Sequence, residues 1–131
     1  MVHAGDATGP GAGQVLLVLT NCPDEATAAR LRHHLIHAHL AACVSQLAPV
    51  TSTYRWQGAV EEAVEIPLLI KTTRARYHAL EAAVRQLHPY AVPEIVAIAI
   101  DSGFPEYLAW VTAESASEAD LQTRSGIESN G

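Results

Sequence analysis

The feature that most constrains the fold of this chain is the alternation of short apolar runs with segments of helical periodicity. Three runs are typical of strands that are buried on at least one face: QVLLVLT at 14–20, EEAVEIPLLIKT at 61–72 and IVAIAI at 95–100. A fourth extended segment, LAACVSQLAPVTSTYRWQ at 40–57, is rich in strand-favouring residues and is interrupted by Pro49. We therefore predict four strands, the middle two joined as a hairpin through Gly58.

Helices are predicted in the intervals between these strands. The first begins near Pro23, which suits the first helical position, and Asp24 and Glu25 then meet the positive end of the helix dipole. RARYHALEAAVRQLH at 74–88 repeats apolar residues with a period of about 3.6. A short terminal helix is expected in FPEYLAWVTA at 104–113. The predicted order is β-α-β-β-α-β-α.

This order is that of the split βαβ plan, in which two right-handed crossovers place two helices on one face of an antiparallel four-stranded sheet. We therefore expect an α+β, ferredoxin-like domain that covers residues 14–113. The flanking segments 1–13 and 114–131 are rich in small or polar residues, so they are expected to be disordered tails.

The hairpin is too long for a plain monomer. At roughly 3.3 Å per residue, residues 40–57 would span about 60 Å when fully extended, whereas a domain of this size has a radius of gyration of about 13 Å. The strand must bend or leave the domain, and exposed strand edges that carry Tyr54 and Trp56 invite aggregation unless another chain covers them. The hairpin from Leu40 to Thr72 is therefore the predicted assembly interface.

Composition limits the function classes. The chain has 131 residues, with 14 acidic against 8 basic side chains and a formal net charge of -6, which disfavours nucleic acid and anionic lipid as partners. The sequence has no basic, apolar leader and no apolar run of membrane-spanning length, so we expect a soluble, cytoplasmic protein. Cys22 and Cys43 are expected to be free thiols, with Cys43 acting as a small buried hydrophobe.

Six short motifs occur in the order in which a known family carries them: LTNCPDEATAARL, LAACVS, STYRWQG, EIPLLIKTT, HPYAVPEI and YLAWV. Several unusual motifs in one order are far more specific than any single motif. The sequence resembles the CutA family of divalent-cation tolerance proteins over residues 14–113. The resemblance implies a ferredoxin-like fold, a tight homotrimer built by strand pairing between subunits, and a connection with copper and other divalent metals. It implies no enzymatic activity.

The resemblance also implies a metal site. In the copper-binding bacterial members, the proposed ligands are a cysteine near the end of the first strand and two successive histidines before a Pro-Tyr pair. In this sequence the three positions are Thr20, Leu87 and His88, and Cys22 lies two residues from the cysteine position. The predicted ligands are therefore His88 and Cys22, for Cu(II) or another divalent metal that is not required for folding. The alternative role of His88 is to stabilise the carboxyl end of the helix.

The segment RLRHHLIHAHLAAC at 30–43 holds four of the seven histidines. With about 100° between successive residues of a helix, Leu31 and Leu35 fall on the buried stripe, and His33 and His37 fall opposite it. An i, i+4 histidine pair can hold a soft or borderline cation, but this segment lacks the glutamate of the zincin motif and a third ligand. We interpret the pair as part of a solvated helix face.

Six residues are candidates for a ligand cleft between subunits: Tyr54, Trp56, Lys71, Tyr90, Glu94 and Trp110. Amphipathic aromatic rings suit interfaces. Lys71 either neutralises an anionic ligand or pairs with Glu65 or Glu94. The alternative role for the rings is ordinary core or subunit packing.

Three function classes are compatible with these features. The preferred class is a trimeric CutA-type protein that responds to divalent metal ions or binds them. The second is a small-ligand or nucleotide sensor that resembles the PII proteins, although no glycine-rich phosphate loop is present and basic residues are few. The third, an acylphosphatase-like enzyme, needs an arginine-bearing loop after the first strand, where this chain has TNCPDEA at 20–26. The fold alone does not choose among them.

Overall fold

The computed structural model describes residues 11–117, which form one sheet and three helices. The elements are, in chain order, β1 Val15–Cys22, α1 Glu25–His37, β2 Cys43–Gln46, β3 Val50–Trp56, β4 Ala59–Thr73, α2 Arg74–Leu87, β5 Val96–Ala99 and α3 Pro105–Glu114. No helix in this range is long and apolar enough to cross a membrane.

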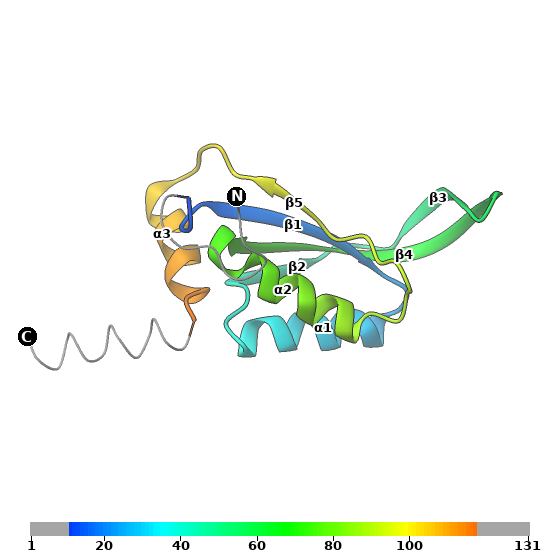
Figure 1. Cartoon of the computed structure of the whole chain (residues 1–131), viewed down its shortest axis with the longest axis horizontal. Coiled ribbons are helices and arrows are strands. Elements are labelled where there is room, and N and C mark those ends of the chain that lie inside the picture. The colour runs from blue at the N-terminus through cyan, green and yellow to red at the C-terminus, as the bar shows by residue number, and fades with distance from the viewer. Residues whose placement is uncertain (1–10, 118–131) are drawn as a thin grey trace, which may run out of the picture.

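The strands form an antiparallel sheet with helices on one face. The strand order is β2-β4-β1-β5, and β3 pairs with the part of β4 that extends beyond its neighbours. Figure 1 shows α1 and α2 side by side against one face of the sheet, with α3 at the end of the sheet away from the hairpin. The predicted α+β, ferredoxin-like arrangement is confirmed.

The core lies between the sheet and these two helices. Alternate side chains of β1 and β4, such as Val18, Leu68 and Ile70, face the helices and are fully buried. They belong to one cluster with Leu35 of α1 and Leu80 of α2, which are also fully buried. Complete burial of an aliphatic side chain contributes about 1.5–3 kcal/mol, so this layer supplies much of the stability of the fold.

The strand predicted over residues 40–57 is two strands rather than one. β2 ends at Gln46 and β3 begins at Val50, and between them lies Pro49, which has no N–H to donate to a ladder. β4 is continuous for 15 residues. Its second half pairs with β1 and β2, and its first half pairs with β3. The β3–β4 hairpin therefore projects beyond the sheet (Figure 1).

A two-residue turn closes this hairpin. Gln57 and Gly58 have φ values of 50° and 83°, and Trp56 pairs with Ala59 on either side of them. Two-residue turns with positive φ at both positions match the right-handed twist of the flanking strands. The turn fixes the register of the hairpin, because the pairing of Trp56 with Ala59 determines all the other residue pairs of β3 and β4.

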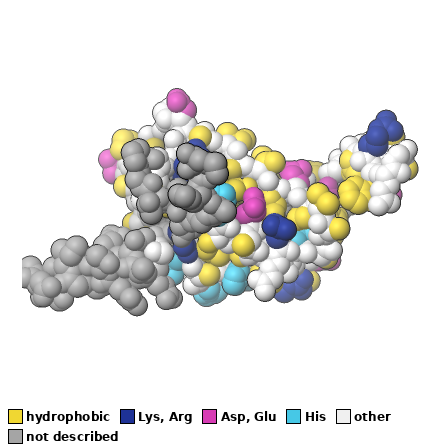
Figure 2. Space-filling model, in the orientation of Figure 1, with side chains coloured by type: hydrophobic (Ala, Val, Ile, Leu, Met, Phe, Trp, Pro, Cys, Tyr) yellow, Lys and Arg dark blue, Asp and Glu magenta, His cyan; other side chains and the backbone are white. Residues whose placement is uncertain are grey.

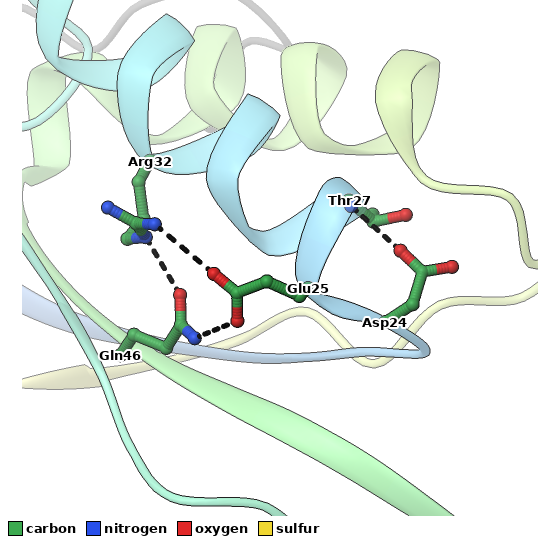
Figure 3. A network of polar contacts seen from close by, with 5 residues as sticks. All are labelled: Asp24, Glu25, Thr27, Arg32 and Gln46. Carbon is green, nitrogen blue, oxygen red and sulfur yellow. Dashed lines mark hydrogen bonds and ion pairs between the residues drawn. The ribbon is translucent and has the colours of Figure 1, made fainter.

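Polar contacts hold α1 in place. The Asp24 carboxylate accepts a hydrogen bond from the Thr27 backbone N–H at 2.8 Å, which caps the helix and lowers the pKa of the Asp24 carboxyl. Gln46, at the end of β2, donates to Glu25 at 2.6 Å and accepts from Arg32 at 2.8 Å. Figure 3 shows these side chains joining the first turns of α1 to β2.

The sheet face opposite α1 and α2 is apolar and only partly covered. Leu19 lies opposite both Leu69 and Val96 in the ladder, and directly opposed residues share a face. Leu19 and Leu69 are half-buried, Val96 is 47% exposed and Ile98 is 52% exposed. β5 is exposed along its whole length, and within residues 11–117 its outer edge pairs with no strand. This face and this edge are open to another chain.

Ordered contacts continue past both predicted domain boundaries. The Ala12 carbonyl accepts a hydrogen bond from the Ala75 N–H at 3.0 Å. α3 extends to Glu114, and Ser115, which follows it, is fully buried. The remaining parts of the predicted tails, 1–10 and 118–131, lie outside the described residues.

Candidate functional site

A pocket of about 760 Å³ lies between the projecting hairpin and the segment that follows α2. We call it the acidic pocket. Its lining residues come from β1, β3, β4 and the segment after α2: Asn21, Ser52, Thr53, Tyr54, Trp56, Glu61, Glu65, Tyr90, Ala91, Val92 and Glu94.

One face of the hairpin forms the first wall of the acidic pocket. Tyr54 lies opposite Glu61, and Trp56 is two residues farther along the same face. Glu65 follows on that face, opposite Val50. Tyr54 and Trp56 are 41% and 44% exposed, whereas Glu65 is only 8% exposed. This wall therefore combines two accessible aromatic rings with two carboxylates, one of which is buried.

The segment after α2 forms the second wall. The Tyr90 hydroxyl donates to the Glu65 carboxylate at 3.3 Å, and burial together with the charge of Glu65 raises the pKa of Tyr90. Asn21, near the end of β1, donates to Glu94 at 3.4 Å. Three glutamates and no Lys or Arg line the acidic pocket. Its field therefore favours a cationic group over an anionic one.

His88 lies beside Tyr90, and both of its ring nitrogens are hydrogen bonded. Its Nε2 is 2.6 Å from the Asn21 carbonyl oxygen, and its Nδ1 accepts from the Tyr90 backbone N–H at 3.2 Å. Because a carbonyl oxygen can only accept, the proton is on Nε2. The side chain is 6% exposed. In this arrangement His88 positions Tyr90 and has no nitrogen left for a metal.

Cys22 and Thr20 lie on the helix-covered face of β1, because the strand continues through both of them. Cys22 is fully buried, and this burial, with a smaller effect from Asp24 and Glu65, raises the pKa of its thiol to about 11. Metals bind the thiolate. The Thr20 hydroxyl is also buried, and it lacks a hydrogen-bond partner among the described residues.

The two predicted ligands, His88 and Cys22, therefore offer no free donor atom to a divalent cation in this arrangement. His88 is fully hydrogen bonded, and Cys22 is held as a thiol away from solvent. Within residues 11–117, no group of three or more His, Cys, Asp or Glu side chains could hold a metal ion.

The structure divides the six predicted cleft residues into two groups. Tyr54, Trp56, Tyr90 and Glu94 line the acidic pocket. The other group, which we call the lysine patch, consists of Lys71, Tyr107 and Trp110: the Lys71 ammonium is 6.0 Å from the centre of the Tyr107 ring, which is 5.6 Å from that of Trp110.

Lys71 pairs with neither of the glutamates suggested for it. An ion pair does form between Arg32 and Glu25, at 3.6 Å. Among residues 11–117, Lys71 and Glu65 are therefore a cation and a buried carboxylate without a partner of opposite charge.

Sequence reasoning missed Glu61 and Tyr107, and it proposed Glu65 only as a partner of Lys71. The turn at Gln57–Gly58 could have identified Glu61, since a two-residue turn there places Glu61 opposite Tyr54. Tyr107 could be placed beside Lys71 only once the docking of α3 was known.

The solvent-exposed face of α1 carries His33 and His37, as expected. Leu31 and Leu35 are fully buried, whereas His33 and His37 are exposed. Cys22 and Cys43 are both free thiols, as predicted. Cys43 is half-buried rather than buried, because it lies opposite Lys71 on the partly covered face of the sheet.

These features define a class of protein: a ferredoxin-like α+β domain with a projecting hairpin and an acidic, aromatic pocket at the base of that hairpin. The family described as CutA1 divalent ion tolerance protein matches residues 16–114 of this chain. The chain belongs to the CutA1 family. The predicted family membership is therefore confirmed.

Individual relatives agree with this assignment. The divalent-cation tolerance protein CutA of Thermus thermophilus is 46% identical over 95 residues, which cover 72% of this chain and 92% of that protein. The mouse protein CutA is 38% identical over 99 residues, or 76% of this chain, but only 56% of the mouse protein is covered. The crystal structure of CutA from Xylella fastidiosa has a TM-score of 0.77 and 43% identity, covering 79% of this chain and 99% of that one. The name of the Thermus protein describes tolerance to divalent cations.

Proposed function

We propose that this protein acts in divalent-cation tolerance as a homotrimer and not as an enzyme, with its functional site at the boundary between subunits. The observation that carries the proposal is the uncovered surface of the single chain. Within residues 11–117, the apolar face around Leu19 and Val96, the outer edge of β5 and the projecting hairpin are all open. Exposed apolar patches and unpaired strand edges are normally covered by another chain.

Charge complementarity supports a head-to-tail arrangement of these chains. The acidic pocket lies at the hairpin end of the molecule, and the lysine patch lies near α3 at the other end (Figure 1). Glu65 is a buried carboxylate whose contact within the described chain is the neutral Tyr90 hydroxyl. A buried charge is costly without a partner of opposite sign. Lys71 of a neighbouring subunit is the proposed partner, and it would complete the cleft.

The alternative, a nucleotide sensor of the PII kind, has less support. A nucleotide carries several negative charges, and the acidic pocket presents three glutamates and no Lys or Arg. Lys71 from a neighbouring subunit would add one positive charge, which leaves the cleft acidic. The chemistry of the cleft favours a cationic ligand or a closed interface.

The mass of the full chain in solution tests the proposed assembly. Multi-angle light scattering at low micromolar concentration should give three times the mass of one chain. The mass of a single chain would refute the proposal. Titration calorimetry with Cu(II), Zn(II) and a nucleoside triphosphate on the same sample separates the metal and nucleotide functions, because only the first two should produce heat.

A double-mutant cycle tests the composite cleft separately from the trimer. Glu65→Gln and Lys71→Met should each lower the stability of the trimer, and the double variant should lower it by less than the sum of the two. Side chains in contact show coupling of about 0.5–3 kcal/mol. Strict additivity in a protein that remains a trimer would exclude this pairing and leave the assembly intact.

A further inference from the structure

Two histidines lie side by side on the exposed face of α1. The rings of His33 and His37 are nearly parallel, with 20° between their planes and 6.2 Å between their centres. Both side chains are exposed. In Figure 2, cyan histidine side chains gather along the lower surface of the molecule, where Figure 1 places α1.

We infer that His33 and His37 form a two-ligand site for a borderline divalent cation such as Cu(II). Imidazole nitrogens suit Cu, Ni and Zn ions. With metal–nitrogen distances of about 2.0–2.1 Å, one cation joins two nitrogens that are about 4 Å apart or closer. Rings whose centres are 6.2 Å apart meet this requirement after small side-chain rotations, which solvent exposure permits.

The nitrogens of this pair are available, unlike those of His88. Neither the His33 ring nor the His37 ring has a hydrogen-bond partner among the described residues, and the two rings stack on each other. His88, by contrast, uses both nitrogens in hydrogen bonds to Asn21 and Tyr90. The inference goes beyond the proposed function, because it places a metal outside the cleft between subunits, and it does not depend on the trimer.

The electrostatic setting of the pair suits a cation. His37 is the last residue of α1, so the pair lies towards the negative end of the helix dipole. Arg30 precedes His33 by about one turn, and its guanidinium donates to the Thr27 hydroxyl at 3.4 Å, towards the other end of the helix. The outward face of α1 is also opposite to the sheet face proposed for assembly, so the site stays accessible in a trimer.

The site offers two protein ligands, and water would complete the coordination. Within residues 11–117 no third His, Cys, Asp or Glu joins the pair. A site with two ligands exchanges its metal readily and does not hold the fold together. The fold is complete without metal, since its core is apolar.

Titration of the full chain with Cu(II), followed by calorimetry and by electron paramagnetic resonance, tests the inference. The chain should bind one Cu(II) through two imidazole nitrogens, and His33→Ala/His37→Ala should weaken this binding by about 100-fold, because even outer-shell substitutions cost about 10- to 100-fold in metal affinity. The matched control is His34→Ala/His78→Ala, which removes two other exposed histidines and should leave the binding unchanged. A third variant, His3→Ala, tests the one histidine that lies outside the described residues.

Three outcomes would overturn the inference. Equal losses in the α1 variant and the matched control would mean that copper binds histidines without regard to position. Loss of the tight binding in His3→Ala or in His88→Ala, with the α1 variant unaffected, would place the metal elsewhere. Light scattering on each variant keeps this result separate from the assembly, because His33 and His37 do not lie on the sheet face proposed for the trimer.

Discussion

His88 donates a hydrogen bond from Nε2 to the carbonyl oxygen of Asn21 at a distance of 2.6 Å, across 67 residues of sequence. The bond ties the end of α2 to the end of β1. Since Nδ1 of the same ring accepts from the Tyr90 N–H, the ring also fixes the segment that forms one wall of the acidic pocket. His88 thus acts in this structure as a positioning residue.

Replacing His88 should lower stability. His88→Ala removes a buried side chain and leaves the part-buried Asn21 carbonyl and Tyr90 N–H without their partners, and leaving such groups unsatisfied costs up to about 1–3 kcal/mol. The free energy of unfolding, measured with urea, should fall by about this amount. His78→Ala, at an exposed position of α2, is the control and should change stability by less than about 0.5 kcal/mol. Equal effects of the two substitutions would contradict the role assigned to His88.

The free energy of unfolding should fall in alkaline solution because of the Cys22 thiol. Its thiol pKa is raised from 9.0 to about 11 by burial. Between these pH values the unfolded chain loses the thiol proton and the folded chain keeps it, so this contribution to stability is complete below pH 9 and is lost as pH rises through 11. Unfolding measured from pH 8 to pH 11 should show a smaller decline for Cys22→Ala than for Cys43→Ala. Identical declines would rule out the thiol as their cause.

Charge on β5 should dissociate the trimer without unfolding the chain. Val96 is 47% exposed in the single chain, so Val96→Arg should leave the monomer folded, yet it would place an unpaired charge in the proposed apolar contact. Ile36→Arg makes the same kind of change on the outer face of α1, where Ile36 is 40% exposed, and should leave the mass unchanged. Light scattering and circular dichroism provide the two readouts. A trimer that tolerates Val96→Arg would move the interface away from β5.

Thr20→Val should be neutral or stabilising. The Thr20 hydroxyl is buried without a partner among the described residues, and valine has a similar shape without the polar atom. Removing an unsatisfied hydroxyl recovers up to about 1–3 kcal/mol. Thermal unfolding should give an equal or higher midpoint, whereas Thr27→Val should lower it, because the Thr27 hydroxyl accepts from Arg30. A lower midpoint for Thr20→Val would indicate that an ordered water satisfies this hydroxyl.

Residues 11–13 and 114–117 should contribute more to the thermal stability of the domain than the sequence indicates. A chain of residues 14–113 loses the hydrogen bond from Ala75 to Ala12 and the buried Ser115, whereas a chain of residues 11–117 keeps both. The shorter chain should therefore melt at a lower temperature. Differential scanning calorimetry on the two chains tests this expectation, and equal midpoints would support the boundaries of 14 and 113 expected from composition.

Much of the fold was predictable because it follows from apolar periodicity. The stripe of Leu31 and Leu35 specifies the buried face of α1, and the continuous apolar run at 14–20 predicts a buried strand, and the structure agrees with both. The division of the second strand depends on how the chain bends at Pro49, which a strand pattern does not specify.

The candidate site was harder to predict from the sequence, since it depends on contacts between residues that are far apart in the sequence. Tyr54 and Trp56 are recognisable as rings on a strand edge. The buried position of Glu65, however, depends on Tyr90, which lies 25 residues away. Lys71 and Glu94 lie in different groups because α3 docks beside Lys71, and no local pattern encodes that docking.

The position of β1 in the sheet has a consequence for the synthesis of the protein. β1 is made first, yet one of its two edges stays unpaired until β5, which ends 77 residues after Cys22, has been made. At a translation rate of about 5–20 residues per second, this takes about 4–15 s. During that interval the nascent chain presents an apolar strand edge. Chaperones should therefore bind the chain on the ribosome mainly before Ala99 has emerged.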